Sequence, residues 1–342
     1  MGLDRRGFLV LSGTALSAFI HQWTAEDPGP LERALHGSRV TPTLVDHLQG
    51  TIDALRTMDA SNGSGTLASL ARTHLAVVVS TLENAAYDEP TGRRLAGIAA
   101  DTATQLGWFY FDAGHHSEAQ RVLLAALRAA HASGDPRLGA GTLSYLAIHG
   151  YSAGDPHDTV TAMEAAREKV RTIRSPALEA MLLTRQARGH AKLGERQACF
   201  RALGVAASLA AEGPSEQDPT WLYWMNPGEV LGQTGSCRLE LGEYREAAGF
   251  FEAADSTLNP ADARTRALFA SRAASAHLLS GDAEGGLAAA ESALTLAANV
   301  RSSRLADHLI DMIDGVQALP GPHAAELVER SKLVITPKEP QS

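Results

Sequence analysis

The chain is poor in cysteine and in aromatic residues. Only two of its 342 residues are cysteine, Cys199 and Cys237, and 5% are aromatic. Two cysteines cannot form a disulfide framework, so we expect both to be buried thiols that pack as small apolar side chains. With few aromatic residues, the core must be built from alanine and leucine. Small residues of this kind favour closely packed helices.

The familiar catalytic and metal-binding motifs are also missing. The sequence contains no Gly-x-Ser-x-Gly, no Cys-x-x-Cys and no His-Glu-x-x-His. His115-His116 is the only adjacent histidine pair, and neighbouring helical residues do not face the same way. The glycine-rich stretch 59–65 lacks the ligands of a calcium loop and the lysine of a phosphate loop, so it is interpreted as a turn. We therefore predict no catalytic residues, no metal, no cofactor and no enzymatic activity.

Positive charge and long apolar runs are scarce as well. The formal net charge is −9, which matches nucleic acid and anionic membranes poorly. The first apolar run, 8–20, is too short to span a bilayer. We therefore expect neither direct nucleic-acid binding nor a membrane interaction.

What the chain does contain is a helical-hairpin pattern within residues 103–126. Gly107 and Ala119 allow two antiparallel helices to approach closely, and Gly114 supplies the turn, where a positive φ suits glycine. Tyr110 and Leu123 would fill the groove between the helices. The spacing resembles that of the tetratricopeptide repeat. One such hairpin cannot bury its apolar face alone, so more of them are expected.

The pattern recurs along the chain. Turn glycines stand at 114, 154, 194, 242 and 281, at spacings of 40, 40, 48 and 39 residues. An alanine follows twelve residues after each of them, at 126, 166, 206, 254 and 293. Five positions after the turn glycine, two repeats have an alanine, and the other three have Thr159, Cys199 and Gly286 instead. Of these three residues, Thr159 fits a small-residue position least well. The sequence predicts an all-α, right-handed helical-hairpin solenoid of tetratricopeptide-like repeats.

The flanking segments divide the chain further. Residues 1–26 hold Arg5-Arg6 and either pack as a first helix or form a twin-arginine export signal; the lack of a small-residue cleavage site favours packing. Residues 27–90 form an N-terminal helical segment with helices at 31–35, 42–58 and 66–86, the second capped by Thr41. Repeats fill 91–319. A helix at 323–332 and a disordered tail complete the segment 320–342.

The longest spacing contains a cluster of aromatic residues, Trp221, Tyr223 and Trp224. One interpretation is a loop that caps a gap between repeats. The other is an aromatic wall of a groove for a ligand or peptide, because Trp and Tyr are favoured anchors in recognition. The candidate partner-binding residues are therefore Trp221, Tyr223 and Trp224, followed by Trp108 and Tyr110, which also have a packing role in the first repeat.

Several segments in order resemble the repeat region of one family. They are Asp4-Arg5-Arg6-Gly7-Phe8-Leu9, 37–40, 106–108, 126–131, 221–224 and 302–304. Together they look like actinobacterial regulators in which a phage-repressor-type helix-turn-helix domain precedes tetratricopeptide-like repeats. That DNA-binding domain would lie before Arg5-Arg6, so this chain itself is not expected to bind DNA.

The leading hypothesis is a cytoplasmic, non-catalytic scaffold or sensor. Its concave face would bind a peptide or protein partner in a regulatory role, linked to transcription or signalling. One alternative is a transcriptional regulator whose helix-turn-helix domain is missing from this chain. Another is an exported binding protein that uses Arg5-Arg6. The sequence leaves open whether the solenoid self-associates.

Overall fold

The protein is all-helical over the residues that the structure, a computed structural model, describes: 39–64 and 67–335. The fold class expected from the sequence is thus confirmed at the level of its secondary structure. The only β-type pairing in this part is an isolated bridge between Arg39 and Ala86. The expected segment 1–26 with Arg5-Arg6, the short helix at 31–35 and the tail from 336 lie outside the described residues.

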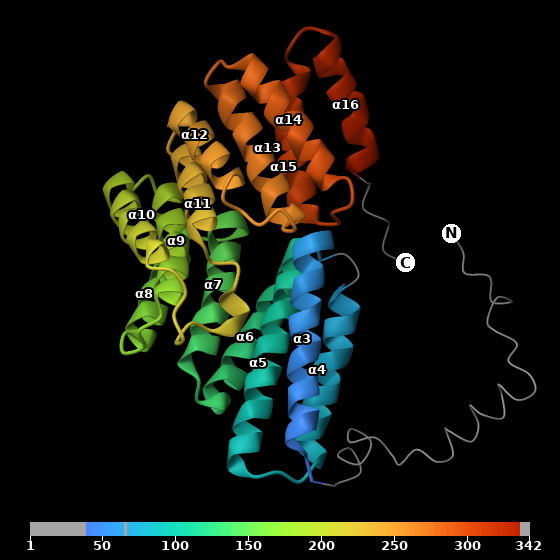
Figure 1. Ribbon diagram of the computed structural model, residues 1–342, viewed down its shortest axis with the longest axis vertical. Coiled ribbons are helices and arrows are strands. Elements are labelled where there is room, and N and C mark those ends of the chain that lie inside the picture. Colours follow the sequence, from blue (N-terminus) through green and yellow to red (C-terminus); the bar gives the residue numbers. More distant parts are fainter. Residues whose placement is uncertain (1–38, 65–66, 336–342) are drawn as a thin grey trace, which may run out of the picture.

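Fourteen α-helices and one 3-10 turn follow one another along the described chain (Figure 1). They are α3 (Pro42–Asn62), α4 (Leu67–Asn84), α5 (Glu89–Asp112), α6 (His116–Ser133), α7 (Pro136–Ala153), α8 (Pro156–Val170), α9 (Pro176–Lys192), α10 (Arg196–Ala211), η1 (Thr220–Leu222), α11 (Pro227–Glu240), α12 (Tyr244–Asp255), α13 (Ala263–Leu279), α14 (Ala283–Ala297), α15 (Ser303–Gln317) and α16 (Pro322–Val334). The helices expected at 42–58, 66–86 and 323–332 are present, with ends shifted by a few residues.

Many helices begin with a capping side chain followed by proline. The Thr41 hydroxyl accepts a hydrogen bond from the Leu44 N–H at 3.3 Å, as the sequence predicts. Such a cap satisfies a free backbone donor, and proline at the first helical position loses no hydrogen bond there. The same pairing recurs at Asp135-Pro136, Asp155-Pro156, Ser175-Pro176 and Asn226-Pro227.

Four of the five turn glycines have a positive φ, between 73° and 86°. The exception is Gly154, whose φ is −121°. There α7 continues until the Gly154 N–H bonds to the Gly150 carbonyl at 3.1 Å, and the Asp155 side chain then caps α8. Because the Asp155 side chain caps α8, this turn does not need a glycine in the left-handed conformation.

The hairpins pack at the small residues that the sequence marks. A Cβ placed on Gly107 would lie 2.6 Å from Leu123 Cγ, so α5 and α6 approach closely only because position 107 is glycine. The five alanines that follow the turn glycines by twelve residues are all 0% exposed. Thr159 is also fully buried, and its hydroxyl donates to the Ala147 carbonyl at 3.0 Å, which satisfies its polar atom.

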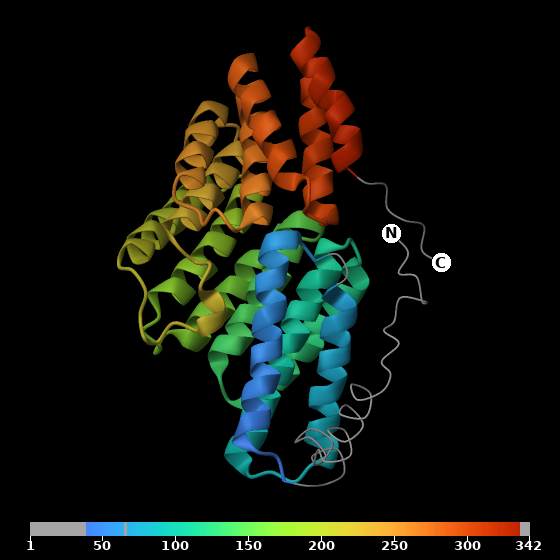
Figure 2. The same ribbon diagram turned by 45° about the vertical axis from the view of Figure 1, so that its right-hand side comes forward.

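The helices form two layers. Each odd-numbered helix from α3 to α13 contacts the next odd-numbered helix, and the even-numbered helices α4 to α14 each pack against the two odd-numbered helices beside them. The odd-numbered helices therefore form an inner layer and the even-numbered ones an outer layer. Figures 1 and 2 show this order along the colour sequence, from blue α3 through green and yellow to red α16.

The inner layer closes on itself, because α3 contacts α13 although some two hundred residues separate them. At the seam the Arg301 N–H donates to the Asn62 carbonyl at 2.8 Å, and the Ser302 hydroxyl donates to Asp112 at 2.8 Å. Gly63 has a φ of +78°, and a Cβ there would lie 2.4 Å from the Arg301 carbonyl oxygen. Closure thus brings α3 and α13 together at a common interior.

Of the helices within 39–64 and 67–335, none combines the length and the apolar character that crossing a membrane requires.

Candidate ligand-binding site

The inner helices enclose two adjoining cavities. The first, of about 100 Å³, is lined by side chains of α3, α5, α7, α9, α11, α13 and α15 together with the loop before α11. The second, of about 230 Å³, lies towards the other ends of these helices. Both are lined by Tyr151, Gln233, Leu268, Phe269 and Arg304, so they adjoin at these side chains. We call them the aromatic cavity and the basic cavity, for the side chains described next.

Three of the five residues singled out in the sequence line the aromatic cavity. Trp108 comes from α5, and Tyr223 and Trp224 come from the loop before α11. Trp108 is buried, whereas Tyr223 is 59% exposed. The structure thus brings together aromatic residues that are more than a hundred positions apart in the sequence.

The other two lie elsewhere. The Trp221 ring fills the space over α7, where a Cβ on Gly141 would come within 2.9 Å of it, so this residue fits the gap-capping interpretation of the loop. Tyr110 does not line either inner cavity and packs edge-on against His115, with ring centroids 6.2 Å apart. Within the loop, Trp221 thus packs on α7, whereas Tyr223 and Trp224 line the aromatic cavity.

A buried ion pair at the seam borders the aromatic cavity. Asp59 of α3 lies 3.3 Å from Arg264 of α13, and it accepts hydrogen bonds from Trp108 Nε1 at 2.9 Å and from Ser64 at 2.9 Å. Burial raises the pKa of Asp59, and Arg264 opposes that rise. The guanidinium groups of Arg264 and Arg304 lie over the Trp108 ring, 5.0 and 5.4 Å from its centroid. Cations prefer the faces of aromatic rings, so these contacts orient the cavity wall.

A second charged pair closes the same cavity from α9 and α11. Arg185 lies 3.5 Å from Glu229, and both side chains are buried. Arg185 also lies over the Trp224 ring at 5.5 Å. Nearby, the Tyr145 hydroxyl donates to Gln105, and burial raises the pKa of Tyr145 to about 12. The acidic and basic groups of the aromatic cavity are thus largely matched.

The basic cavity has an excess of positive charge. Arg188, Lys192 and Arg272 all contact one carboxylate, that of Glu240, at 3.3, 2.6 and 3.1 Å. Within the described residues, Arg304 forms no hydrogen bond or ion pair, although the buried carboxylate of Asp112 lies near enough to oppose the lowering of its pKa by burial. Burial lowers the pKa of Arg272 to about 10, with a further contribution from the neighbouring Arg188. Two buried arginines and an exposed lysine therefore share a single, partly buried acid here.

Several polar atoms of this cavity lack partners. Arg188 Nε, Arg272 Nε, Gln233 Oε1 and Ser236 Oγ are buried without a hydrogen bond. The Arg188 side chain is only 4% exposed. Buried polar atoms in proteins are nearly always paired with protein, water or ligand. Both donors and acceptors in the wall of this cavity therefore lack a partner within the described residues.

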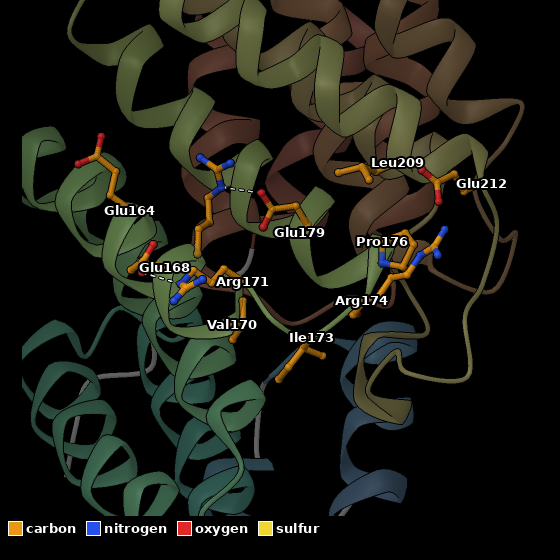
Figure 3. A pocket seen from close by; sticks show the side chains of 12 residues that line it. Glu164, Glu168, Val170, Arg171, Ile173, Arg174, Pro176, Glu179, Leu209 and Glu212 are labelled. Atoms are coloured by element: carbon orange, nitrogen blue, oxygen red, sulfur yellow. Dashed lines mark hydrogen bonds and ion pairs between the residues drawn. The ribbon is translucent and has the colours of Figure 1, made fainter.

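A third cavity lies on the outer side, between the end of α8 and the start of α9 (Figure 3). It is larger than the two inner cavities, at about 530 Å³, but two of its three arginines are paired with glutamates. Arg167 bonds to Glu179 at 2.7 Å and Arg171 to Glu168 at 2.8 Å, and Glu164 and Glu212 add further negative charge. Figure 3 shows these pairs as dashed lines. The formal charge of this cavity's lining is about −1, and its lining residues include no aromatic side chain.

The side chains that could bind a metal ion or act as a reactive thiol are considered next, within the described part of the chain. No three histidine, cysteine, aspartate or glutamate side chains gather there as a metal ion would need. Cys199 and Cys237 are both buried free thiols, as expected. Burial raises the pKa of Cys237, and a hydrogen bond from that thiol lowers the pKa of Cys199.

Comparison of the sequence with protein-family models and with curated proteins gave no match. The likeness to repeat-containing actinobacterial regulators therefore remains an expectation from the sequence.

Sequence reasoning missed the arginines of the inner face. Arg185, Arg188, Arg264, Arg272 and Arg304 lie on three inner helices that are distant in sequence. A signal was present: Arg185 and Arg188, like Arg304 and the histidine at 308, stand at i, i+3 or i, i+4 on one helix face.

Proposed function

We propose that the chain is a non-catalytic helical-repeat scaffold or sensor that binds a peptide segment of a partner on its inner face, in a regulatory role. The observation that carries the proposal is the cavity pair. Aromatic rings of Trp108, Tyr223 and Trp224 line one cavity, and the adjoining cavity is lined by residues of three inner helices that carry unpartnered buried polar atoms. Sites for organic ligands combine apolar walls with a few convergent polar groups in this way.

The proposal extends to the architecture. The hairpins would form a right-handed solenoid of tetratricopeptide-like repeats, whose inner face is a natural recognition surface. Supporting this are the recurrent turn glycines, the fully buried alanines and the division into inner and outer helices. We further propose that the protein acts in the cytoplasm.

The dimensions favour a peptide segment over a folded protein surface. The cavities of about 100 and 230 Å³ lie within a ring of inner helices, which a globular domain could not enter. An extended segment or a chain end could place one or two side chains there. Tyr223, which is the most exposed of the aromatic lining residues, would meet the incoming chain first.

The test is selection of a displayed random peptide library on the full chain, followed by calorimetry of the recovered peptides. We expect Tyr223→Ala and Trp224→Ala to weaken binding by about tenfold or more, because aromatic anchors dominate recognition energies. Tyr87→Ala is the matched control: Tyr87 is an exposed tyrosine outside both cavities. Failure to recover any binding peptide, or equal affinity for all three variants, would overturn the proposal.

A further inference from the structure

We infer that the basic cavity binds the dianionic phosphate group of a phosphate monoester, held by Arg188, Arg272 and Arg304. The inference rests on the proposed function in one respect, the use of the inner face as the binding surface. It adds the chemical class of the group that is bound there.

The first argument for an anion site is the balance of charge among the residues that line the basic cavity. Four cationic side chains, from Arg188, Lys192, Arg272 and Arg304, line this cavity. Against them stand the partly buried Glu240 and the exposed Asp307. The formal charge of the lining is therefore about +2, in a chain whose net charge is −9. Buried charges of one sign are costly unless they are paired, so the cavity is built for an anion.

The number of charges selects the kind of anion. A single carboxylate would leave part of the positive charge uncompensated. A phosphate monoester carries about −1.5 to −2 near neutral pH and offers three terminal oxygens. Guanidinium groups bind such oxygens with paired hydrogen bonds. Here the three guanidinium groups line one cavity from three different helices, α9, α13 and α15.

The second, independent argument comes from buried nitrogen atoms of the cavity that have no hydrogen-bond acceptor. Arg188 Nε and Arg272 Nε are buried donors without an acceptor, although each arginine already contacts Glu240 through a terminal nitrogen. The Glu240 contacts therefore leave part of each guanidinium group unsatisfied in the wall of the cavity. Arg304 needs no rearrangement of a protein ion pair to join them, since it has none within the described residues.

The cavity also provides an entrance and a place for the organic part of the ligand. Its rim is formed by the exposed residues Gly114, His116, Ser152 and Lys192, so an anion can enter from solvent. Its inner end meets the aromatic cavity at Tyr151 and Phe269. A phosphate bound between the arginines would thus direct its organic group towards aromatic rings.

The experiment is isothermal titration calorimetry of the full chain at low salt with three phosphate probes. They are inorganic phosphate, ribose 5-phosphate and a blocked Gly-Gly-phosphoserine-Gly-Gly peptide, each phosphorylated organic probe paired with its unphosphorylated form. We expect the phosphorylated probes to bind at one site and the unphosphorylated forms to bind at least tenfold more weakly. The tighter of the two organic probes identifies the source, a small metabolite or a phosphorylated chain.

Variants locate the site. Arg304→Gln is expected to weaken phosphate binding by about tenfold or more, and Arg304→Lys by less, because it keeps the charge but loses the paired donors. Lys192→Gln, at the exposed rim, should weaken it severalfold without affecting folding. Arg171→Gln is the matched control: it removes an exposed arginine of the outer cavity and should leave the affinity unchanged.

Two results would overturn the inference: no preference for the phosphorylated probes, or equal phosphate affinity of Arg304→Gln, Lys192→Gln and the wild type. If selected peptides bind while phosphate adds nothing, the inference is wrong and the proposed function stands. If phosphate binds as expected while no peptide can be recovered, the proposed function is wrong and the anion site stands.

Discussion

The seam that closes the inner layer depends on Asp59, so replacing it should open a large part of the interior. In Asp59→Ala, Arg264 loses its acidic partner while its side chain stays 16% exposed, and Trp108 Nε1 loses its acceptor. Removing one partner of a buried ion pair costs about 3–5 kcal/mol, because the other charge is left uncompensated. We therefore expect Asp59→Ala to lower the free energy of unfolding by that amount.

The assay is urea unfolding followed by circular dichroism at pH 7, with a double-mutant cycle. Arg264→Met removes the stranded charge, so the double variant Asp59→Ala/Arg264→Met should be more stable than the sum of the two single losses predicts, by about 1–3 kcal/mol. The matched control is Asp46→Ala. Asp46 pairs with Arg94 at 2.7 Å, but the two side chains are 66% and 54% exposed, so the loss should stay below about 1 kcal/mol.

The reasoning would be refuted if Asp59→Ala cost no more than Asp46→Ala. It would also be refuted by a double-mutant cycle without coupling, because the ion pair across the seam would then contribute nothing to closure.

Three further predictions concern packing, protonation and thiol reactivity. Gly107→Ala should lower stability by about 1–3 kcal/mol, because its Cβ would meet Leu123, whereas Gly204→Ala, with open space around it, should raise stability by up to about 1 kcal/mol; urea midpoints compare them. Burial beside Arg272, Arg304, Arg188 and Lys192 lowers the pKa of His308 well below 6.5, so the unfolded chain binds more protons below that pH and stability falls as the pH falls. The loss reaches about 1.4 kcal/mol at pH 5.5, and His308→Gln should abolish this part of the pH dependence, measured as unfolding curves at pH 7.5 and 5.5. Cys199 and Cys237 should react with a thiol reagent only after unfolding in guanidinium chloride; rapid labelling of the native protein would contradict their burial.

The sequence predicts the helical hairpins well because their signals are local. Gly107 lies close to Leu123 within one hairpin, and Thr41 caps a helix three residues away. Such short-range relations repeat along the chain, so regular spacing alone reveals them. The capping of α8 by Asp155, which removes the need for a left-handed Gly154, is a local detail that alignment on glycines cannot show.

The cavities depend on contacts between helices that lie far apart in the sequence, and no local sequence pattern indicates these contacts. Asp59 meets Arg264 only because the inner layer closes between α3 and α13. The small rotation from one hairpin to the next accumulates over the whole array, and it decides which inner faces meet. Aromatic clustering did indicate Tyr223 and Trp224, since large rings are conspicuous in a chain with few of them. Arg188 and Arg272 gave no comparable signal, because each resembles a surface residue until the structure shows its burial.

The most direct test of binding within the inner layer is site-specific photo-crosslinking. We would place p-benzoylphenylalanine at Tyr223, on the cavity wall, or at Leu333, which is 85% exposed on α16, and irradiate each protein with a peptide recovered by selection. The account predicts an efficient crosslink from position 223 and none from position 333. A crosslink from position 333 alone, or equal crosslinking from both positions, would contradict it.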